Sequence, residues 1–151
     1  MHPIRALSAT FLLGLTMACT SNSQMATATM PTTKMLSAQL SAASEVPPAT
    51  SNGTGMLEAS VNTQTMVMSY TVTYSGLTGA ATAGHFHGPA AVGANAGVAL
   101  PLAGNVASPI KGEAALTAAQ MVQVMAGSWY VNLHTAANPN GEIRGQVMVK
   151  P

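Results

Sequence analysis

Charged side chains are scarce in this chain of 151 residues, because Lys, Arg, Asp and Glu together make up 6% of it, against about a quarter in typical globular proteins. Asp is absent, and the only side-chain carboxylates are Glu45, Glu58, Glu113 and Glu142. Acid–base chemistry therefore has few candidates, and most hydrolase mechanisms are not expected. The formal net charge is +1, which argues against nucleic-acid binding, since that interaction depends on clustered Lys and Arg.

The chain also has a single cysteine, Cys19, so an internal disulfide cannot form. Cys19 follows a cationic start and the apolar run ALSATFLLGLTMA at residues 6–18. This run is shorter than the roughly 20 apolar residues of a membrane-spanning helix, so we expect residues 1–19 to be a secretory signal peptide. The sequence LTMAC at residues 15–19 resembles a bacterial lipobox, which implies lipidation of the Cys19 sulfur. Plain secretion is the alternative.

These features predict an exported lipoprotein of the bacterial cell envelope, in the periplasm or at the outer membrane, held to the membrane through Cys19. Residues 20–35 have little periodicity and few bulky side chains, which predicts a flexible linker. Without residues 1–19, the side chains carry four positive and four negative charges. Hydroxyl and amide groups must then keep the mature protein in solution.

From Leu36 onward, apolar and polar residues mostly alternate, as in strands with one buried face. Residues 57–61 and 66–74 alternate in this way around the turn-like Asn62-Thr63-Gln64, which predicts a hairpin. Further strands are expected at four segments separated by Gly and Pro, namely 83–87, 97–102, 129–135 and 142–149. Residues 36–151 are thus predicted to form one all-β domain, an antiparallel, Greek-key-like β-sandwich.

One segment departs from this alternation. In LTAAQMVQVMAG at residues 116–127, Thr117 and Gln120 have the spacing of a capping box, and Gly127 suits the position just after a helix. We therefore expect one short helix of about two turns there.

Three of the four histidines lie outside the signal segment: His85, His87 and His134. His85 and His87 flank Phe86, and alternate residues of a strand share one face, so both are expected opposite a core-facing Phe86. The same alternation in residues 129–135 places His134 opposite Trp129. If the two strands are neighbours, the three imidazoles converge, as they do in copper and zinc sites.

Two interpretations of these histidines remain open. In the first they bind copper or zinc, with Glu142 or water as a further ligand, or with Met66 or Met68 for Cu(I) only. In the second they are hydrogen-bonded histidines of a strand, which are common. For the methionines the favoured interpretation is packing, because Met fills irregular gaps in cores.

The segment at residues 136–146 combines the turn formers Asn-Pro and Asn-Gly with two of the few charges. Glu142 and Arg144 are two residues apart on the expected strand, so their side chains should share a face. They are candidate ligand contacts, with a solvated pair or a local ion pair as the alternative. The glycine-rich loop after His87 lacks the Lys and the helix start of a phosphate loop.

Four segments resemble the CHRD domain family: SAASEVPPATSNGTGMLEASV (41–61), AGHFHGPAAVGANAGVALPL (83–102), LTAAQMVQVMAGSWYVNLHT (116–135) and HTAANPNGEIRGQV (134–147). The resemblance covers about residues 36–149. It implies a β-sandwich-like extracellular module to which no enzyme activity is generally attached. The motif positions that it carries over are His85, His87, Asn132, His134, Glu142 and Arg144.

The expected function is non-catalytic: a lipid-anchored envelope domain that binds a ligand, with copper or zinc as candidate cofactor, through its histidine-bearing strand face. The alternative is a structural or adhesive module, with the histidines as a hydrogen-bonded knot and another envelope or matrix protein as partner. An enzyme is less expected. The His-x-His strand is similar to the copper-ligand strand of copper-zinc superoxide dismutase, but this chain lacks Asp, a cysteine pair and enough histidines for two metals.

Overall fold

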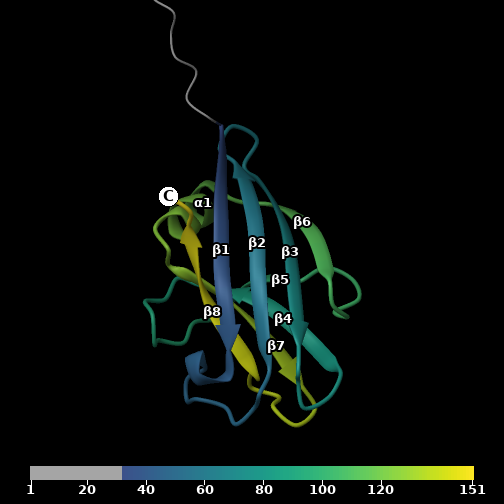
Figure 1. Ribbon diagram of the computed structural model, residues 1–151. Helices are drawn as coiled ribbons and strands as arrows, with labels where there is room; N and C mark the ends of the chain where they lie inside the picture. Colours follow the sequence, from purple (N-terminus) through teal and green to yellow (C-terminus); the bar gives the residue numbers. More distant parts are fainter. Residues whose placement is uncertain (1–31) are drawn as a thin grey trace, which may run out of the picture.

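The computed structural model describes residues 32–151, so the predicted signal peptide, Cys19 and most of the predicted linker lie outside the described residues. The strands are β1 (Thr33–Ser41), β2 (Thr54–Asn62), β3 (Val67–Ser75), β4 (Ala81–His87), β5 (Val98–Pro101), β6 (Ile110–Ala115), β7 (Trp129–Thr135) and β8 (Ile143–Val149). A 3-10 turn, η1 (Ala42–Ser44), follows β1, and the helix α1 (Ala118–Met125) precedes β7 (Figure 1). Within residues 32–151, no helix is long and apolar enough to span a membrane.

The strands form one antiparallel sheet in the order β5-β4-β7-β8-β1-β2-β3-β6. The sheet curls over, so that β4 and β7 pass behind β1, β2 and β3 in Figure 1. Tyr70 of β3 and Phe86 of β4 show the closure, because their ring centroids are 5.2 Å apart although four strands separate β3 from β4 in the sheet order. The core fills the space between the two halves, which confirms the predicted all-β, antiparallel sandwich with one short helix.

The predicted hairpin is formed by β2 and β3, which pair along their whole lengths. Asn62 ends β2, and its Oδ1 accepts hydrogen bonds from the backbone N–H groups of Gln64 and Thr65 in the turn. Met68 is fully buried, as its packing role predicts. Met66 instead lies in the turn at φ 56° and is 37% exposed, so it packs less than predicted.

The helix α1 begins with the predicted capping box. The backbone N–H of Gln120 donates to Thr117 Oγ1 at 3.2 Å, and that of Thr117 donates to Gln120 Oε1 at 2.9 Å. Gly127 follows the helix at φ 70°, a conformation that favours glycine. Val124 anchors the helix by packing, fully buried, into the core.

Two strands, β1 and β6, lie outside the segments that the sequence analysis named as strands. β1 begins at Thr33, so residues 33–35 of the predicted linker belong to the sheet. β6 was not predicted, because Gly112 interrupts its alternation. A Cβ at Gly112 would lie 2.4 Å from the Tyr70 hydroxyl oxygen, so the glycine leaves room for the Tyr70 ring, and this close approach is not visible in the sequence.

Candidate functional site

The neighbouring strands β4 and β7 bring the three histidines together. In their antiparallel register, His85 lies opposite Asn132, His87 opposite Tyr130, and His134 opposite Ala83. One ring nitrogen from each histidine lies within 4.8 Å of the others. The predicted convergence of His85, His87 and His134 is therefore present.

The amide oxygen of Asn132 lies at the centre of this cluster. Asn132 Oδ1 is 3.0 Å from His87 Nε2 and 3.1 Å from His134 Nε2. His134 Nε2 is in turn 3.1 Å from His85 Nδ1. Asn132 is one of the motif positions named in the sequence analysis. The structure adds that its side-chain oxygen contacts the ring nitrogens of His87 and His134.

Two backbone carbonyls determine which ring nitrogens carry hydrogen. His87 Nδ1 lies 3.0 Å from the Ala96 carbonyl oxygen, and His134 Nδ1 lies 3.0 Å from that of Pro139. A carbonyl oxygen can only accept a hydrogen bond, so each Nδ1 donates and the Nε2 of each neutral ring holds a lone pair. Both lone pairs face Asn132 Oδ1, which is also an acceptor. Three acceptors thus converge without a hydrogen between them, and a cation would relieve their repulsion.

The electrostatics favour the neutral forms of His85 and His134. Burial lowers the pKa of His85, and the neighbouring His134 and His87 lower it further. Burial also lowers the pKa of His134, although its hydrogen bond to Pro139 acts in the opposite direction. Neutral histidine is the form that binds metals.

A loop and an aromatic stack cover the inner side of the cluster. The rings of His87 and Tyr130 are stacked, with centroids 4.7 Å apart, and Arg144 Cζ lies 3.4 Å from the Tyr130 centroid. Arg144 is 2% exposed and donates to Asn95 Oδ1 and to the Ala94 carbonyl. Arg144 therefore holds the loop whose Ala96 carbonyl orients His87.

Glu142 is buried in a different environment. Its Oε1 accepts hydrogen bonds from Ser51 Oγ and Thr78 N, and its Oε2 accepts from Thr78 Oγ1, Thr135 Oγ1 and Asn138 Nδ2. Burial alone would raise the pKa of Glu142, but the hydrogen bonds from Ser51, Thr135 and Thr78 lower it to about 2. Both oxygens are thus occupied by contacts that join three loops.

Glu142 and Arg144 do not form an ion pair. Among residues 32–151 the ion pair joins Lys150 Nζ to Glu58 Oε1 at 3.1 Å. The two charges that stand close together in the sequence therefore have separate partners, and Glu142 is not one of the residues grouped around the histidine nitrogens.

Glu45 is a site residue that the sequence analysis did not single out. It is 6% exposed, and its Oε1 is buried without a hydrogen-bond partner. Glu45 borders a hollow of about 390 Å³ together with His87, Tyr130 and Asn132. The available signal was its place in the Glu-Val-Pro-Pro motif, but 40 residues separate it from the first histidine of the cluster, so the sequence alone does not place it here.

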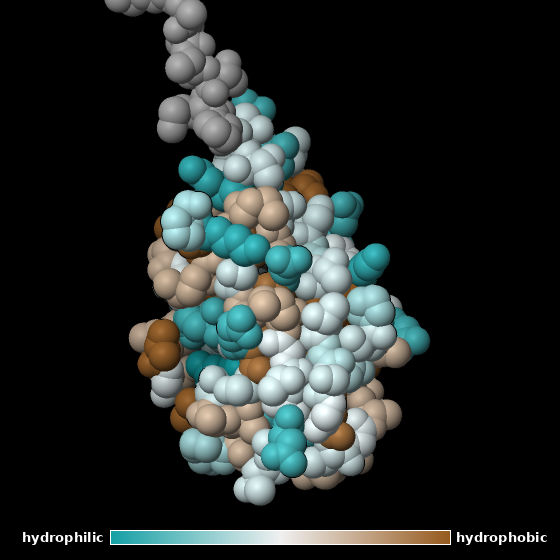
Figure 2. All heavy atoms as spheres, in the orientation of Figure 1, coloured by the Kyte–Doolittle hydropathy of each residue, from teal (hydrophilic) through white to brown (hydrophobic). Residues whose placement is uncertain are grey.

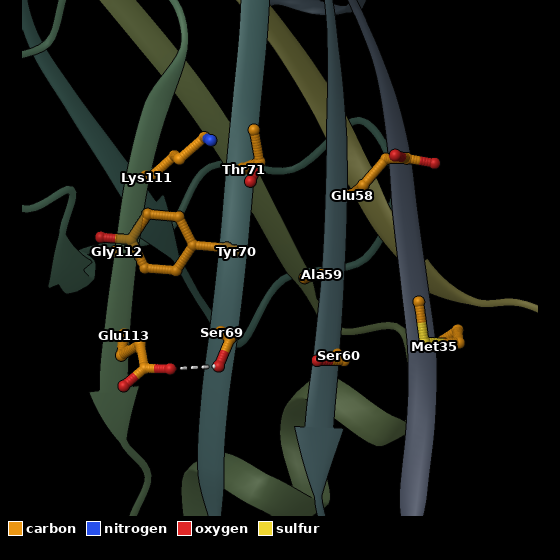
Figure 3. A pocket seen from close by; sticks show the side chains of 10 residues that line it. All are labelled: Met35, Glu58, Ala59, Ser60, Ser69, Tyr70, Thr71, Lys111, Gly112 and Glu113. Atoms are coloured by element: carbon orange, nitrogen blue, oxygen red, sulfur yellow. Dashed lines mark hydrogen bonds between the residues drawn. The ribbon is translucent and has the colours of Figure 1, made fainter.

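A second hollow, of about 500 Å³, lies on the outer face of β1, β2, β3 and β6 (Figure 3). Polar side chains line much of it, and Ser69 Oγ donates to Glu113 Oε1 at 2.7 Å. These four strands carry none of the three histidines. On the face drawn in Figure 2, apolar residues are scattered and do not form one continuous patch.

One comparison with known proteins gives a match. The model of the CHRD domain matches residues 36–147, which is most of the chain and includes every residue of the histidine cluster. No curated protein and no solved structure matches the chain.

Proposed function

The chain belongs to the CHRD domain family, and we propose that its domain binds one copper or zinc ion, without catalysis, through His85, His87 and His134. The observation that carries this proposal is the convergence of acceptors. Asn132 Oδ1 lies 3.0 Å from His87 Nε2 and 3.1 Å from His134 Nε2, and backbone carbonyls hold the hydrogens of both rings on the far side. Metal-binding histidines commonly donate their second nitrogen to a carbonyl in this way.

The cluster fits such an ion in chemistry and nearly fits it in size. Imidazole nitrogen suits zinc and copper, and copper(II) binds such sites more tightly than zinc. Bonds of about 2.0 to 2.1 Å place two ligand atoms at most about 4.2 Å apart. The 3.1 Å between His85 Nδ1 and His134 Nε2 lies within this limit, whereas the group as a whole is bounded by 4.8 Å and would have to contract slightly around the ion.

Binding, and not catalysis, is proposed because three of the four carboxylates lie away from the cluster. Glu142 is occupied by its hydrogen bonds, and Glu58 and Glu113 line the outer hollow in Figure 3. The remaining carboxylate, Glu45, borders the hollow beside His87. A superoxide dismutase-like activity is the weakest alternative, since the cluster offers histidines for one metal only.

Calorimetric titration of the purified protein with Cu(II) and with Zn(II) tests the proposal. We expect binding of one ion at micromolar or tighter affinity, lost in the double variant His85→Ala/His87→Ala. Glu58→Gln, which changes an exposed side chain away from the histidines, is the control and should bind as the wild type does. Absence of micromolar binding of either metal to the wild type would refute the proposal.

A structural role is the second candidate, and the contact between His85 and His134 favours it. If His85 Nδ1 carries a hydrogen, it donates to His134 Nε2 across 3.1 Å and links β4 to β7 without a metal. In that case the domain serves as a structural or adhesive module for another envelope or matrix protein. Unfolding of the double variant in metal-free buffer, combined with no metal binding by the wild type, would favour this candidate.

The proposed location is the bacterial cell envelope, with the domain held to a membrane through lipidated Cys19. The support is the signal-like sequence of residues 1–19, which lies outside the described residues. Secretion without an anchor is the alternative. An exported domain would meet copper and zinc in that compartment without a disulfide to stabilise it.

A further inference from the structure

The side-chain amide of Asn132 has two orientations, and they give the histidine cluster opposite properties. With Oδ1 toward the rings, as found here, the cluster contains only acceptors at its centre and favours a cation. With the amide rotated by half a turn, Nδ2 would donate to the Nε2 lone pairs of His87 and His134. The cluster would then be a satisfied hydrogen-bonded knot with no need of a metal.

Glu45 lies on the other side of this amide. An ideal Cβ on Gly141 would stand 2.4 Å from Glu45 Oε1 and 3.0 Å from Asn132 Nδ2, so both atoms lie against the same backbone position. Gly141 has φ 130°, in the region that favours glycine, and its missing side chain leaves the space that the carboxylate occupies. A side-chain hydrogen bond from Asn132 acts on the Glu45 carboxyl group, and its donor must be the amide nitrogen, because the amide oxygen only accepts.

A carboxylate can only accept hydrogen bonds, so it favours the orientation in which Asn132 presents its N–H groups. The rotated amide would set the carbonyl oxygen of Asn132 beside the carboxylate of Glu45, and two acceptors would face each other. Glu45 Oε1 is already buried without a hydrogen-bond partner, so a second acceptor beside this carboxylate would be unfavourable.

We infer that Glu45 makes this cluster a metal site instead of a hydrogen-bonded knot, because its carboxylate holds the Asn132 oxygen toward the histidines. The inference rests on the proposed function and assigns Glu45 the part of a positioning residue. It explains why a protein with four carboxylates keeps one buried beside three histidines. Glu45 belongs to the Glu-Val-Pro-Pro segment, which is far in sequence from β4 and β7, the strands that carry the histidines.

The substitution Glu45→Gln has opposite effects on metal affinity and on metal-free stability. A glutamine amide can donate to Asn132 Oδ1 once the Asn132 amide has rotated, and Asn132 Nδ2 then donates to the histidines. Burial raises the pKa of Glu45, and Arg144 and Asn132 act in the opposite direction without cancelling it. The fold thus disfavours the ionised carboxylate, so removing its charge should stabilise the metal-free protein despite the nearby Arg144.

The experiment compares the full-length wild type, Glu45→Gln and the control Glu58→Gln, an exposed carboxylate on the outer face. Each protein is titrated with Cu(II) and Zn(II), and each is melted in the presence of a chelator. We expect Glu45→Gln to bind both metals 10 to 100 times more weakly, the usual effect of losing a residue that orients a ligand. Its metal-free melting temperature should rise by a few degrees, and Glu58→Gln should change neither quantity.

Three outcomes would overturn the inference, and they differ from each other. If the wild type binds neither metal, the proposed function fails as well. If the wild type binds and Glu45→Gln has the same affinity, only the role of Glu45 fails. If affinity and metal-free melting temperature both fall, Glu45 merely supports the fold. Should Glu45→Gln not fold, Glu45→Ala removes the acceptor without adding a donor, and its retention of wild-type affinity would also refute the inference.

A metal-free measurement gives independent support. The ¹⁵N chemical shifts of the imidazole nitrogens distinguish a bare lone pair from one that accepts a hydrogen bond. We expect the Nε2 shifts of His87 and His134 to change toward the hydrogen-bonded value in Glu45→Gln and to stay unchanged in Glu58→Gln. Unchanged shifts in Glu45→Gln would show that the Asn132 amide does not rotate.

Discussion

The substitution Glu142→Gln should destabilise the domain strongly at neutral pH and have little effect at low pH. Glu142 is fully buried, and its two oxygens accept five hydrogen bonds from three loops and the end of β7. In the variant, the glutamine oxygen must face the backbone N–H of Thr78, because that donor cannot rotate. The glutamine nitrogen then faces Asn138 Nδ2, a second donor, and one hydrogen bond is replaced by a repulsive contact.

The magnitude follows from the pKa of Glu142, which the fold lowers from an ordinary 4.5 to about 2. Each tenfold change in proton affinity corresponds to about 1.4 kcal/mol, so the ionised carboxylate contributes about 3 kcal/mol to the free energy of unfolding. Because the pKa is lowered in the folded state, this contribution is complete above pH 4.5 and disappears as the pH falls toward 2. More than half of it should be lost by about pH 3.

Urea denaturation followed by the fluorescence of Trp129, the one tryptophan of the chain, measures this contribution at pH 7, 5 and 3. We expect the variant to be about 3 kcal/mol less stable than the wild type at pH 7 and pH 5, with a smaller difference at pH 3. Glu58→Gln, whose partner Lys150 is solvent-exposed, should cost less than about 1 kcal/mol. A cost of Glu142→Gln below about 0.5 kcal/mol at pH 7, or a difference independent of pH, would refute this account.

Three further predictions concern the fold and the anchor. Thr117→Ala removes the capping box of α1 and should lower stability by about 1 kcal/mol in the same urea assay, whereas Thr63→Ala in the exposed hairpin turn should have a smaller effect. Gly112→Ala places a methyl group against the Tyr70 ring and should cost about 1 to 3 kcal/mol by thermal denaturation; an unchanged melting temperature would contradict the close packing there. Cys19→Ala should move the exported protein from the membrane fraction to the soluble fraction, and continued membrane association would exclude lipidation at Cys19.

Local sequence patterns predicted the parts of the fold that depend on local physics. Period-two alternation identified the hairpin of β2 and β3, and capping chemistry identified α1. The same alternation placed His85 and His87 on the face opposite Phe86, and the structure confirms that Phe86 is fully buried. These predictions succeed because each of them depends only on residues that are close together in the sequence.

The sequence could not reveal contacts between distant segments. Glu142 and Arg144 look like a pair in the sequence, yet Glu142 precedes β8 and turns toward Thr78 and Ser51, while Arg144 turns toward Tyr130. Glu45 reaches the histidine cluster only because β8 pairs with both β1 and β7, which brings the segment after β1 close to Gly141 and Asn132. Such placements depend on strand order, which residue periodicity does not encode.

The position of β8 in the sheet bears on the order of assembly. β8 is the last strand in the sequence, but it pairs with both β7 and β1 and is the link between the group β5-β4-β7 and the group β1-β2-β3-β6. A chain that lacks Ile143–Val149 would consist of two half-sheets with unsatisfied edges, and pairings of such large sequence separation form slowly. The pair of β4 and β7 that carries the three histidines does not include β8, but Arg144 of β8 and the segment after β1 reach it only after the C-terminal strand has been made and has inserted between the two halves.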